Sequence, residues 1–165
     1  MKTKKLYINT IGCQMNVYDS EQIVKRLHGL GYVMETRVEE ADLVIMNTCS
    51  IREKAEQKAF SFLGRLARMK QDKPRLMVGV CGCVAQQEGQ KIIERMPHVD
   101  FVLGTQAIER LPAAIEKIEK HRCRIVDVDM SQEIQEAPEV SVSTHSREVS
   151  RFVTIMRGCD NYCTY

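Results

Sequence analysis

The chain has 165 residues, of which 44% are hydrophobic and 28% are charged, and its formal net charge is +2. This composition fits one folded domain with a tail, and the near-neutral charge excludes a global field that would draw the whole chain to nucleic acid. No apolar run approaches the roughly 20 residues that span a bilayer, and the first apolar segment is too short for an export signal. We therefore expect a cytoplasmic protein without membrane contact.

Hydrophobic periodicity predicts strands that alternate with helices along most of the chain. In chain order, the predicted elements are a strand at 5–11, a helix at 20–30, strands at 32–38 and 42–48, a helix from 50 that Pro74 closes, a strand at 75–80, a helix at 85–96, a strand at 99–103, a helical turn at 105–110, a helix opening near Pro112 and a strand at 124–128. Such alternation is typical of an α/β fold, here an open, mostly parallel, doubly wound sheet with flanking helices.

Residues 130–150 differ from the rest because they are poor in large apolar side chains and rich in Ser, Glu and Gln. This composition predicts a linker. We expect a first domain at 1–129, the linker at 130–150, and the truncated start of a second domain at 151–165, which opens with a strand.

Three of the seven cysteines, Cys13, Cys49 and Cys83, each follow the end of a predicted strand, at intervals of 36 and 34 residues. A βαβ unit takes about 30 residues or more, so each interval returns the chain to the same sheet edge. In open parallel sheets, ligands bind at that edge. The cysteines therefore predict one site for a [4Fe–4S] cluster with an open iron.

Two other interpretations of the cysteines stay open. A structural zinc site needs four closed ligands, usually in tight pairs, and among the cysteines up to Cys123 only Cys81 and Cys83 form a close pair. A cysteine can also be a small buried hydrophobe, which is our interpretation of Cys81 and Cys123. An odd count without an export signal argues against a disulfide framework.

The last residues carry a second cysteine pattern, in which Cys159 and Cys163 are separated by three residues and Tyr165 ends the chain. A further cysteine directly after Tyr165 would complete the Cys-x3-Cys-x2-Cys loop by which radical S-adenosylmethionine enzymes hold a [4Fe–4S] cluster through three thiolates. We expect the third ligand beyond the chain's end.

The residues around the cysteines resemble the MiaB-type methylthiotransferases, in the family's order and over the whole chain. The matching segments are 12–16 with 19–21, 47–49 with 51–55, 82–86 and 157–165. The pair Gln14-Met15 and the pair Arg52-Glu53 favour the branch that acts on isopentenyladenosine. The alternatives are the branches for threonylcarbamoyladenosine and for a ribosomal protein.

The resemblance implies a two-cluster radical enzyme, and we expect it to be a monomer. Cys13, Cys49 and Cys83 would hold an auxiliary [4Fe–4S] cluster, Cys159 and Cys163 would hold the radical cluster, and Tyr165 would contact S-adenosylmethionine. The substrate would be the adenosine of the tRNA anticodon loop at position 37, which gains a methylthio group at C2. Because the barrel and a ligand are absent, we expect the 165 residues alone to be inactive.

A basic stretch runs from Arg52 to Arg75, where eight cations stand against three acids, a charge of +5 that leaves −3 elsewhere. It fits either a solvated helix face or a surface for the phosphates of tRNA. The residues expected to contact RNA are Arg52, Lys58, Arg65 and Arg68. A further alternative for the whole chain is a cluster-bearing or zinc-bearing binding module without catalysis.

Overall fold

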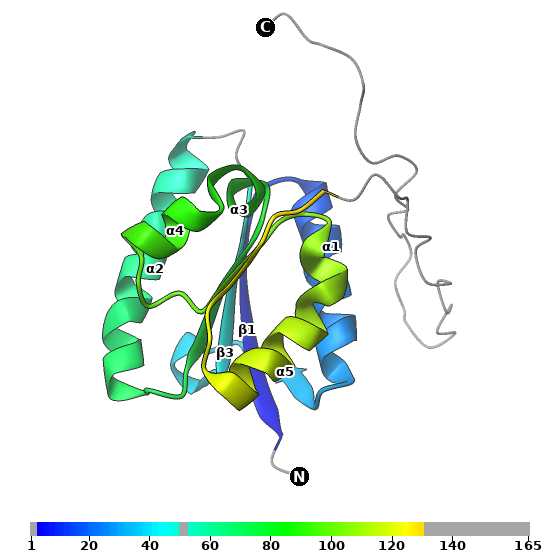
Figure 1. Ribbon diagram of the computed structural model, residues 1–165, viewed down its shortest axis with the longest axis vertical. Coiled ribbons are helices and arrows are strands. Elements are labelled where there is room, and N and C mark those ends of the chain that lie inside the picture. The colour runs from blue at the N-terminus through cyan, green and yellow to red at the C-terminus, as the bar shows by residue number, and fades with distance from the viewer. Residues whose placement is uncertain (1–2, 50–52, 131–165) are drawn as a thin grey trace, which may run out of the picture. The chain divides into compact units, whose positions relative to one another are not determined.

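The computed structural model describes residues 3–49 and 53–130, without the side chains of 53–56. These residues form three layers, with a parallel sheet between two layers of helices (Figure 1). Within them, no helix is long and apolar enough to cross a membrane. The predicted α/β class with a mostly parallel sheet is confirmed.

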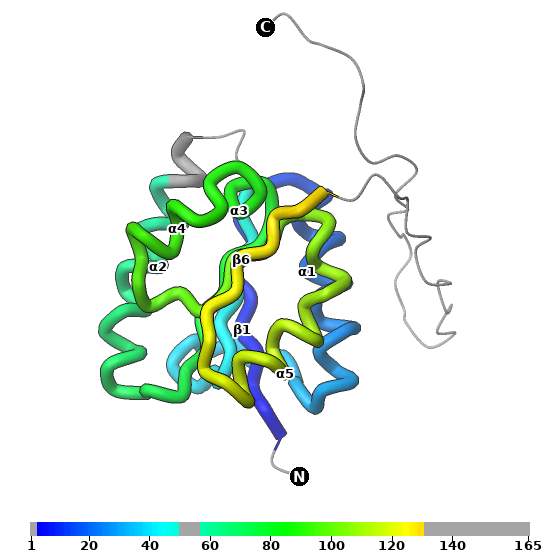
Figure 2. Tube along the Cα trace, viewed as in Figure 1, coloured from blue at the N-terminus to red at the C-terminus, as the bar shows by residue number. Residues whose placement is uncertain are grey.

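The sheet has six strands in the order β2-β1-β3-β4-β5-β6, and every described pairing is parallel. The strands are β1 (Lys4–Ile11), β2 (Tyr32–Met34), β3 (Leu43–Thr48), β4 (Met77–Gly82), β5 (Phe101–Leu103) and β6 (Ile125–Asp127). Figure 2 views the sheet from its β6 edge. The chain winds first from β1 to β2 and then back past β1 to β3. The winding therefore reverses between β1 and β3, which is where open α/β sheets bind ligands.

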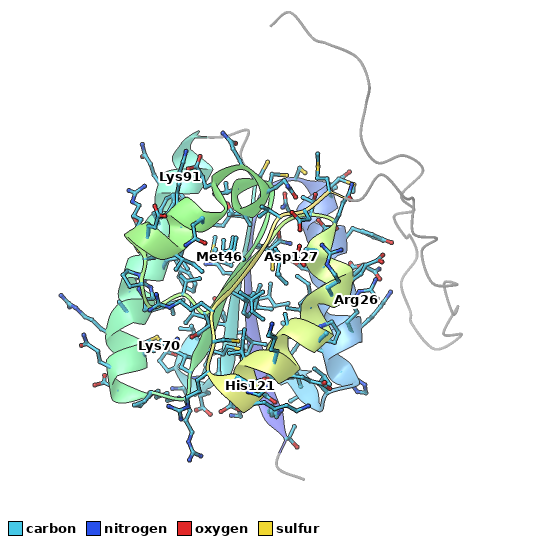
Figure 3. The ribbon with its side chains drawn as sticks, in the orientation of Figure 1. Arg26, Met46, Lys70, Lys91, His121 and Asp127 are labelled. Atoms are coloured by element: carbon cyan, nitrogen blue, oxygen red, sulfur yellow. The ribbon has the colours of Figure 1, made fainter. Side chains whose placement is uncertain are left out.

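Helices cover both faces of the sheet (Figure 1). They are α1 (Gln14–His28), η1 (Val38–Glu40), α2 (Glu53–Asp72), α3 (Cys83–Glu88), α4 (Gln90–Arg95), η2 (Ala107–Arg110) and α5 (Leu111–His121). One core contains the buried side chains of α2, α3 and α4, and the other contains those of α1 and α5. Strands β3 and β4 are buried along their whole length because each face meets one of these cores. Met46 of β3 lies in the α2-side core, as Figure 3 shows.

Three predicted boundaries were wrong. Helix α1 begins at Gln14 and not near residue 20, because its first turns bury the polar Asn16 and Asp19, which hydrophobic periodicity does not detect. The helix predicted at 85–96 is divided into α3 and α4 at Gly89, whose φ is +46°. Strand β2 ends at Met34 and not at residue 38.

Polar side chains form hydrogen bonds and an ion pair at the amino edge of the sheet. An Asp100 carboxylate oxygen accepts the Val78 backbone N–H at 2.8 Å and pairs with Lys70. His98 Nε2 lies 2.8 Å from the backbone oxygen of Leu63, so it donates that hydrogen bond. Lys70 lies toward the lower end of α2 in Figure 3.

Candidate metal and RNA site

The strand register places the three cysteine loops side by side at the carboxyl edge. Ile11 pairs with Thr48, and Thr48 pairs with Gly82, so the ends of β1, β3 and β4 form one row. Cys49 and Cys83 directly follow this row, and Cys13 follows it by one residue more. Neighbouring strands lie about 4.8 Å apart, so the three loops span two strand spacings.

The three cysteines differ in exposure. Cys13 is exposed and is the N-cap residue of α1. Cys49 is buried, with 3% of its surface exposed, and its backbone N–H donates to the Ile11 oxygen at 3.0 Å. Cys83 is half-buried and is the first residue of α3. The set therefore combines one exposed, one half-buried and one buried cysteine.

Two glycines allow these loops to approach closely. A Cβ at Gly12 would lie 2.9 Å from the Cys49 Cβ and 2.1 Å from the Asn16 Oδ1. A Cβ at Gly82 would lie 2.5 Å from the Thr48 backbone oxygen, and the φ of Gly82 is +94°. The residues that precede Cys13 and Cys83 thus press against the end of β3, and neither position has room for a side chain.

Behind the cysteines, a chain of polar side chains joins α1, β1 and β3. Asn16 Nδ2 donates to Asn47 Oδ1 at 3.0 Å, and Asn47 Nδ2 donates to the Asn16 backbone oxygen at 2.8 Å. Asn47 Nδ2 also donates to Ser20 Oγ at 2.9 Å, and that hydroxyl lies 2.8 Å from Thr10 Oγ1. Asn16 and Asn47 are 1% and 0% exposed. We call Asn16 and Asn47 the amide pair.

The donor set consists of thiols, which are the usual ligands of iron–sulfur clusters. In the described residues, no three His, Cys, Asp or Glu side chains are grouped closely enough to hold one metal ion. A cubane receives each thiolate on a different iron, so its ligands stand farther apart than those of one ion. The buried Thr48 Oγ1 has no hydrogen-bond partner among the described residues and stands beside Cys49. Three thiols and one unpaired hydroxyl at this edge are compatible with such a cluster.

The other described cysteines have different surroundings. Cys81 lies in β4 and is fully buried, and this burial raises the pKa of its thiol, with a smaller contribution from Asp19. Cys123 precedes β6, which places it at the amino edge, near the end of α5 that His121 marks in Figure 3. It packs against the α1-side core. The interpretation of Cys81 as a buried core residue is confirmed, whereas Cys123 is only partly buried at the margin of that core.

The basic stretch lies on α2, beside a groove. Lys58, Arg65 and Arg68 are exposed. The groove has a volume of about 610 Å³ and is lined by Asn9, Ile11, Gln57, Lys58, Ser61, Phe62 and Arg65. The Arg65 guanidinium lies 5.4 Å from the centre of the Phe62 ring. Since Ile11 ends β1 just before Cys13, the groove adjoins the cysteine edge.

Some of the predicted site residues lie outside the described residues. These are Arg52, Cys159, Cys163 and Tyr165, together with the predicted start of a helix at residue 50, most of the linker and the predicted strand after it. Their assignments remain predictions from the sequence.

A family model described as "Uncharacterized protein family UPF0004" matches residues 5–104. The chain belongs to the UPF0004 family. The matched range contains Cys13, Cys49 and Cys83, the amide pair and the groove, so the whole described site lies inside the UPF0004 domain.

Three curated relatives carry the name tRNA-2-methylthio-N(6)-dimethylallyladenosine synthase. The protein of Desulfosudis oleivorans is 51% identical over 98% of this chain, and that of Syntrophotalea carbinolica is 49% identical over 98%. A protein of Cereibacter sphaeroides is 47% identical over 99%. The chain spans 35–37% of the length of these relatives.

Sequence reasoning missed the amide pair as part of the site. The available signal was the polar Asn47 inside the otherwise apolar run of β3, together with Asn16, which stands three residues after Cys13. In the hydrophobic pattern such residues appear only as polar interruptions of an apolar run. In the structure they join the cysteine loops through hydrogen bonds.

Proposed function

We propose that this chain provides the cluster-binding domain of a tRNA methylthiotransferase. That enzyme would replace the C2 hydrogen of N(6)-isopentenyladenosine at position 37 of tRNA by a methylthio group. The observation that carries the proposal is the identity of about half of all residues, over nearly the whole chain, with relatives named for this reaction. The convergence of three cysteine loops at the ligand-binding edge supports it independently.

The cofactors would be two [4Fe–4S] clusters and S-adenosylmethionine. When bound, these groups supply radical cleavage of S-adenosylmethionine and delivery of sulfur. Cys13, Cys49 and Cys83 would hold the auxiliary cluster, and Cys159 with Cys163 would hold the other. The buried position of Cys49 would keep water away from part of the site. The exposed Cys13 would lie on the side where substrate enters.

The groove between β1 and α2 would contact the tRNA. Lys58 and Arg65 offer cations to backbone phosphates, and none of the described residues that line the groove is acidic. Phe62 adds an aromatic wall, and Asn9 adds an amide that can hydrogen-bond a base of a single-stranded loop. Because the groove adjoins the cysteine edge, RNA bound there would place an anticodon-loop base within reach of the site.

A domain exchange tests the reaction. The corresponding N-terminal part of the Desulfosudis oleivorans relative is replaced by this chain, and tRNA nucleosides are analysed by mass spectrometry after anaerobic reaction. We expect 2-methylthio-N(6)-isopentenyladenosine from the chimera and none from the 165 residues alone. A chimera that folds and loads iron but leaves the nucleoside unmodified, while the intact relative modifies it, would contradict the proposal.

Charge reversal tests the RNA surface in the same chimera. Lys58→Glu, Arg65→Glu and Arg68→Glu together should weaken tRNA binding and flatten its salt dependence by about one unit of slope per lost contact. The matched control reverses Lys25, Lys117 and Lys120, which are exposed cations on α1 and α5. Equal effects of the two triple variants would mean that the α2 face is only a solvated surface.

A further inference from the structure

We propose that the amide pair Asn16–Asn47 is a positioning device that sets Cys13 for cluster binding before any metal arrives. The inference rests on the proposed function, since it takes Cys13 as a cluster ligand. Its evidence is separate, however, because it comes from hydrogen bonds among residues that are not ligands.

The contact with Cys13 is made by one atom. Asn16 Oδ1 accepts the Cys13 backbone N–H at 3.1 Å and lies 3.5 Å from its Sγ, which donates as a thiol. Cys13 is the most exposed of the three cysteines and sits in an extended N-cap conformation, with φ −102° and ψ −177°. The Asn16 side chain therefore restrains the ligand that the rest of the fold encloses least.

The partner residue determines which end of the Asn16 amide faces Cys13. Asn47 Nδ2 donates to the Asn16 backbone oxygen, which can only accept, so Asn47 must present its Oδ1 to the Asn16 side chain. That oxygen needs a donor, and Asn16 Nδ2 supplies it. The Asn16 Oδ1 is consequently left for the Cys13 N–H. The hydrogen bonds of Asn47 in β3 thus fix the orientation of the Asn16 amide, and this orientation places an acceptor at the Cys13 N–H.

Two glycines pack closely against the amide pair and leave it no room to change its position. A Cβ at Gly12 would collide with the Asn16 side chain, and a Cβ at Gly82 would come within 2.6 Å of Asn47 Oδ1. The amide pair therefore touches the residues that precede both Cys13 and Cys83, while Asn47 itself lies two residues before Cys49. One buried polar contact links all three cysteine loops.

Cluster binding would change this contact in a defined way. A thiolate ligand has lost its proton to solvent, so the Sγ–H donation to Asn16 Oδ1 ends while the backbone N–H donation remains. The backbone bond would then hold Cys13 in place in both states. Residues that orient ligands in this way typically change metal affinity by about 10–100-fold when they are replaced.

The test uses the 165-residue chain with Cys159→Ser and Cys163→Ser, reconstituted anaerobically with iron and sulfide. For Asn16→Ala, we expect loss of iron to a chelator to be about 10–100-fold faster than for the unaltered residue. Asn16→Asp retains an acceptor for the Cys13 N–H but removes the donor that Asn47 Oδ1 needs, so it should also lose iron faster than the unaltered chain. Its negative charge should also lower the cluster's midpoint potential.

The matched control is Asp100→Asn, which weakens a comparable polar contact at the amino edge. It should reduce the thermal stability of the metal-free chain without accelerating iron loss. If iron loss in Asn16→Ala and Asp100→Asn follows only the drop in stability, the amide pair is structural and the proposal is wrong. Unchanged iron loss in Asn16→Ala would overturn it as well.

A measurement on the unmodified, metal-free chain covers the case in which Asn16→Ala does not fold. The Cys13 amide should be protected from hydrogen exchange, although its residue is exposed, because Asn16 accepts its hydrogen. Exchange at the rate of an unprotected amide would refute the positioning role. If the unaltered chain binds no iron, the proposed function fails at its metal site, and the exchange result still decides whether the device exists.

Discussion

Replacing Gly82 by alanine should destabilise the fold and spread the cysteine edge. Gly82 has φ +94° and ψ −163°, a backbone region that is essentially restricted to glycine, so an alanine there costs about 1–3 kcal/mol. Its Cβ would also lie 2.5 Å from the Thr48 backbone oxygen and 2.6 Å from Asn47 Oδ1. The first atom is backbone and the second is held by the hydrogen bonds of the amide pair, so relieving such overpacking costs about 1–3 kcal/mol more.

The sum is about 2–6 kcal/mol, against a total stability of about 5–15 kcal/mol for a domain of this kind. With a urea m-value of about 2 kcal/mol/M, the unfolding midpoint should fall by about 1–3 M. The assay is urea unfolding of the metal-free chain, followed by circular dichroism. Iron uptake should fall as well, because relief of the clash moves Gly82 and Thr48 apart, and these residues precede Cys83 and Cys49.

The control is Gly64→Ala in α2, at an exposed position where a Cβ meets nothing within 4 Å. This change should raise stability by about 0.5–1 kcal/mol, since alanine restricts the unfolded chain and favours the helix. The two substitutions add the same methyl group, but we expect Gly82→Ala to lower the free energy of unfolding and Gly64→Ala to raise it. A Gly82→Ala chain whose midpoint stays within about 0.3 M of the unaltered chain would refute the steric argument.

Three further predictions concern single residues. Burial lowers the pKa of His98, so the unfolded state binds a proton on this residue more readily than the folded state does. The contribution of His98 to the stability of the fold is therefore complete above the unfolded pKa of about 6.5 and declines as the pH falls below it. Urea unfolding at pH 7.5 and 5.5 should show this loss, and His98→Gln should reduce it. Lys5 and two backbone N–H groups lower the pKa of Glu35 to about 2. The contribution of Glu35 to the stability of the fold is therefore present above about pH 4.5 and is lost as the pH falls toward 2. Glu35→Gln should therefore flatten acid unfolding in that range, and an unchanged acid profile would contradict the assignment. Finally, Cys123→Ser should leave iron per chain unchanged whereas Cys49→Ser should reduce it, and equal iron losses would remove the distinction between core and ligand cysteines.

The sequence by itself determined the α/β class and the position of most strands, because buried parallel strands are continuous apolar runs. Residues 42–48 predicted β3 on this basis, and the structure confirms a strand buried along its whole length. The cysteines could be placed at strand ends for the same reason. Periodicity detected only the apolar half of α1, since its first turns bury the polar Asn16 and Asp19, and Asn16 is hydrogen-bonded to Asn47.

The tertiary structure alone decided how the cysteine loops approach one another. The order β2-β1-β3-β4 makes the strands that precede Cys13 and Cys83 the two neighbours of β3, and no local pattern encodes that order. The partnership of Asn16 with Asn47, 31 residues apart, likewise exists only once β1 and β3 are paired. A long-range contact of this kind depends on the register of the whole sheet. The sequence could therefore identify the candidate ligands, whereas only the folded chain could reveal the amide pair behind them.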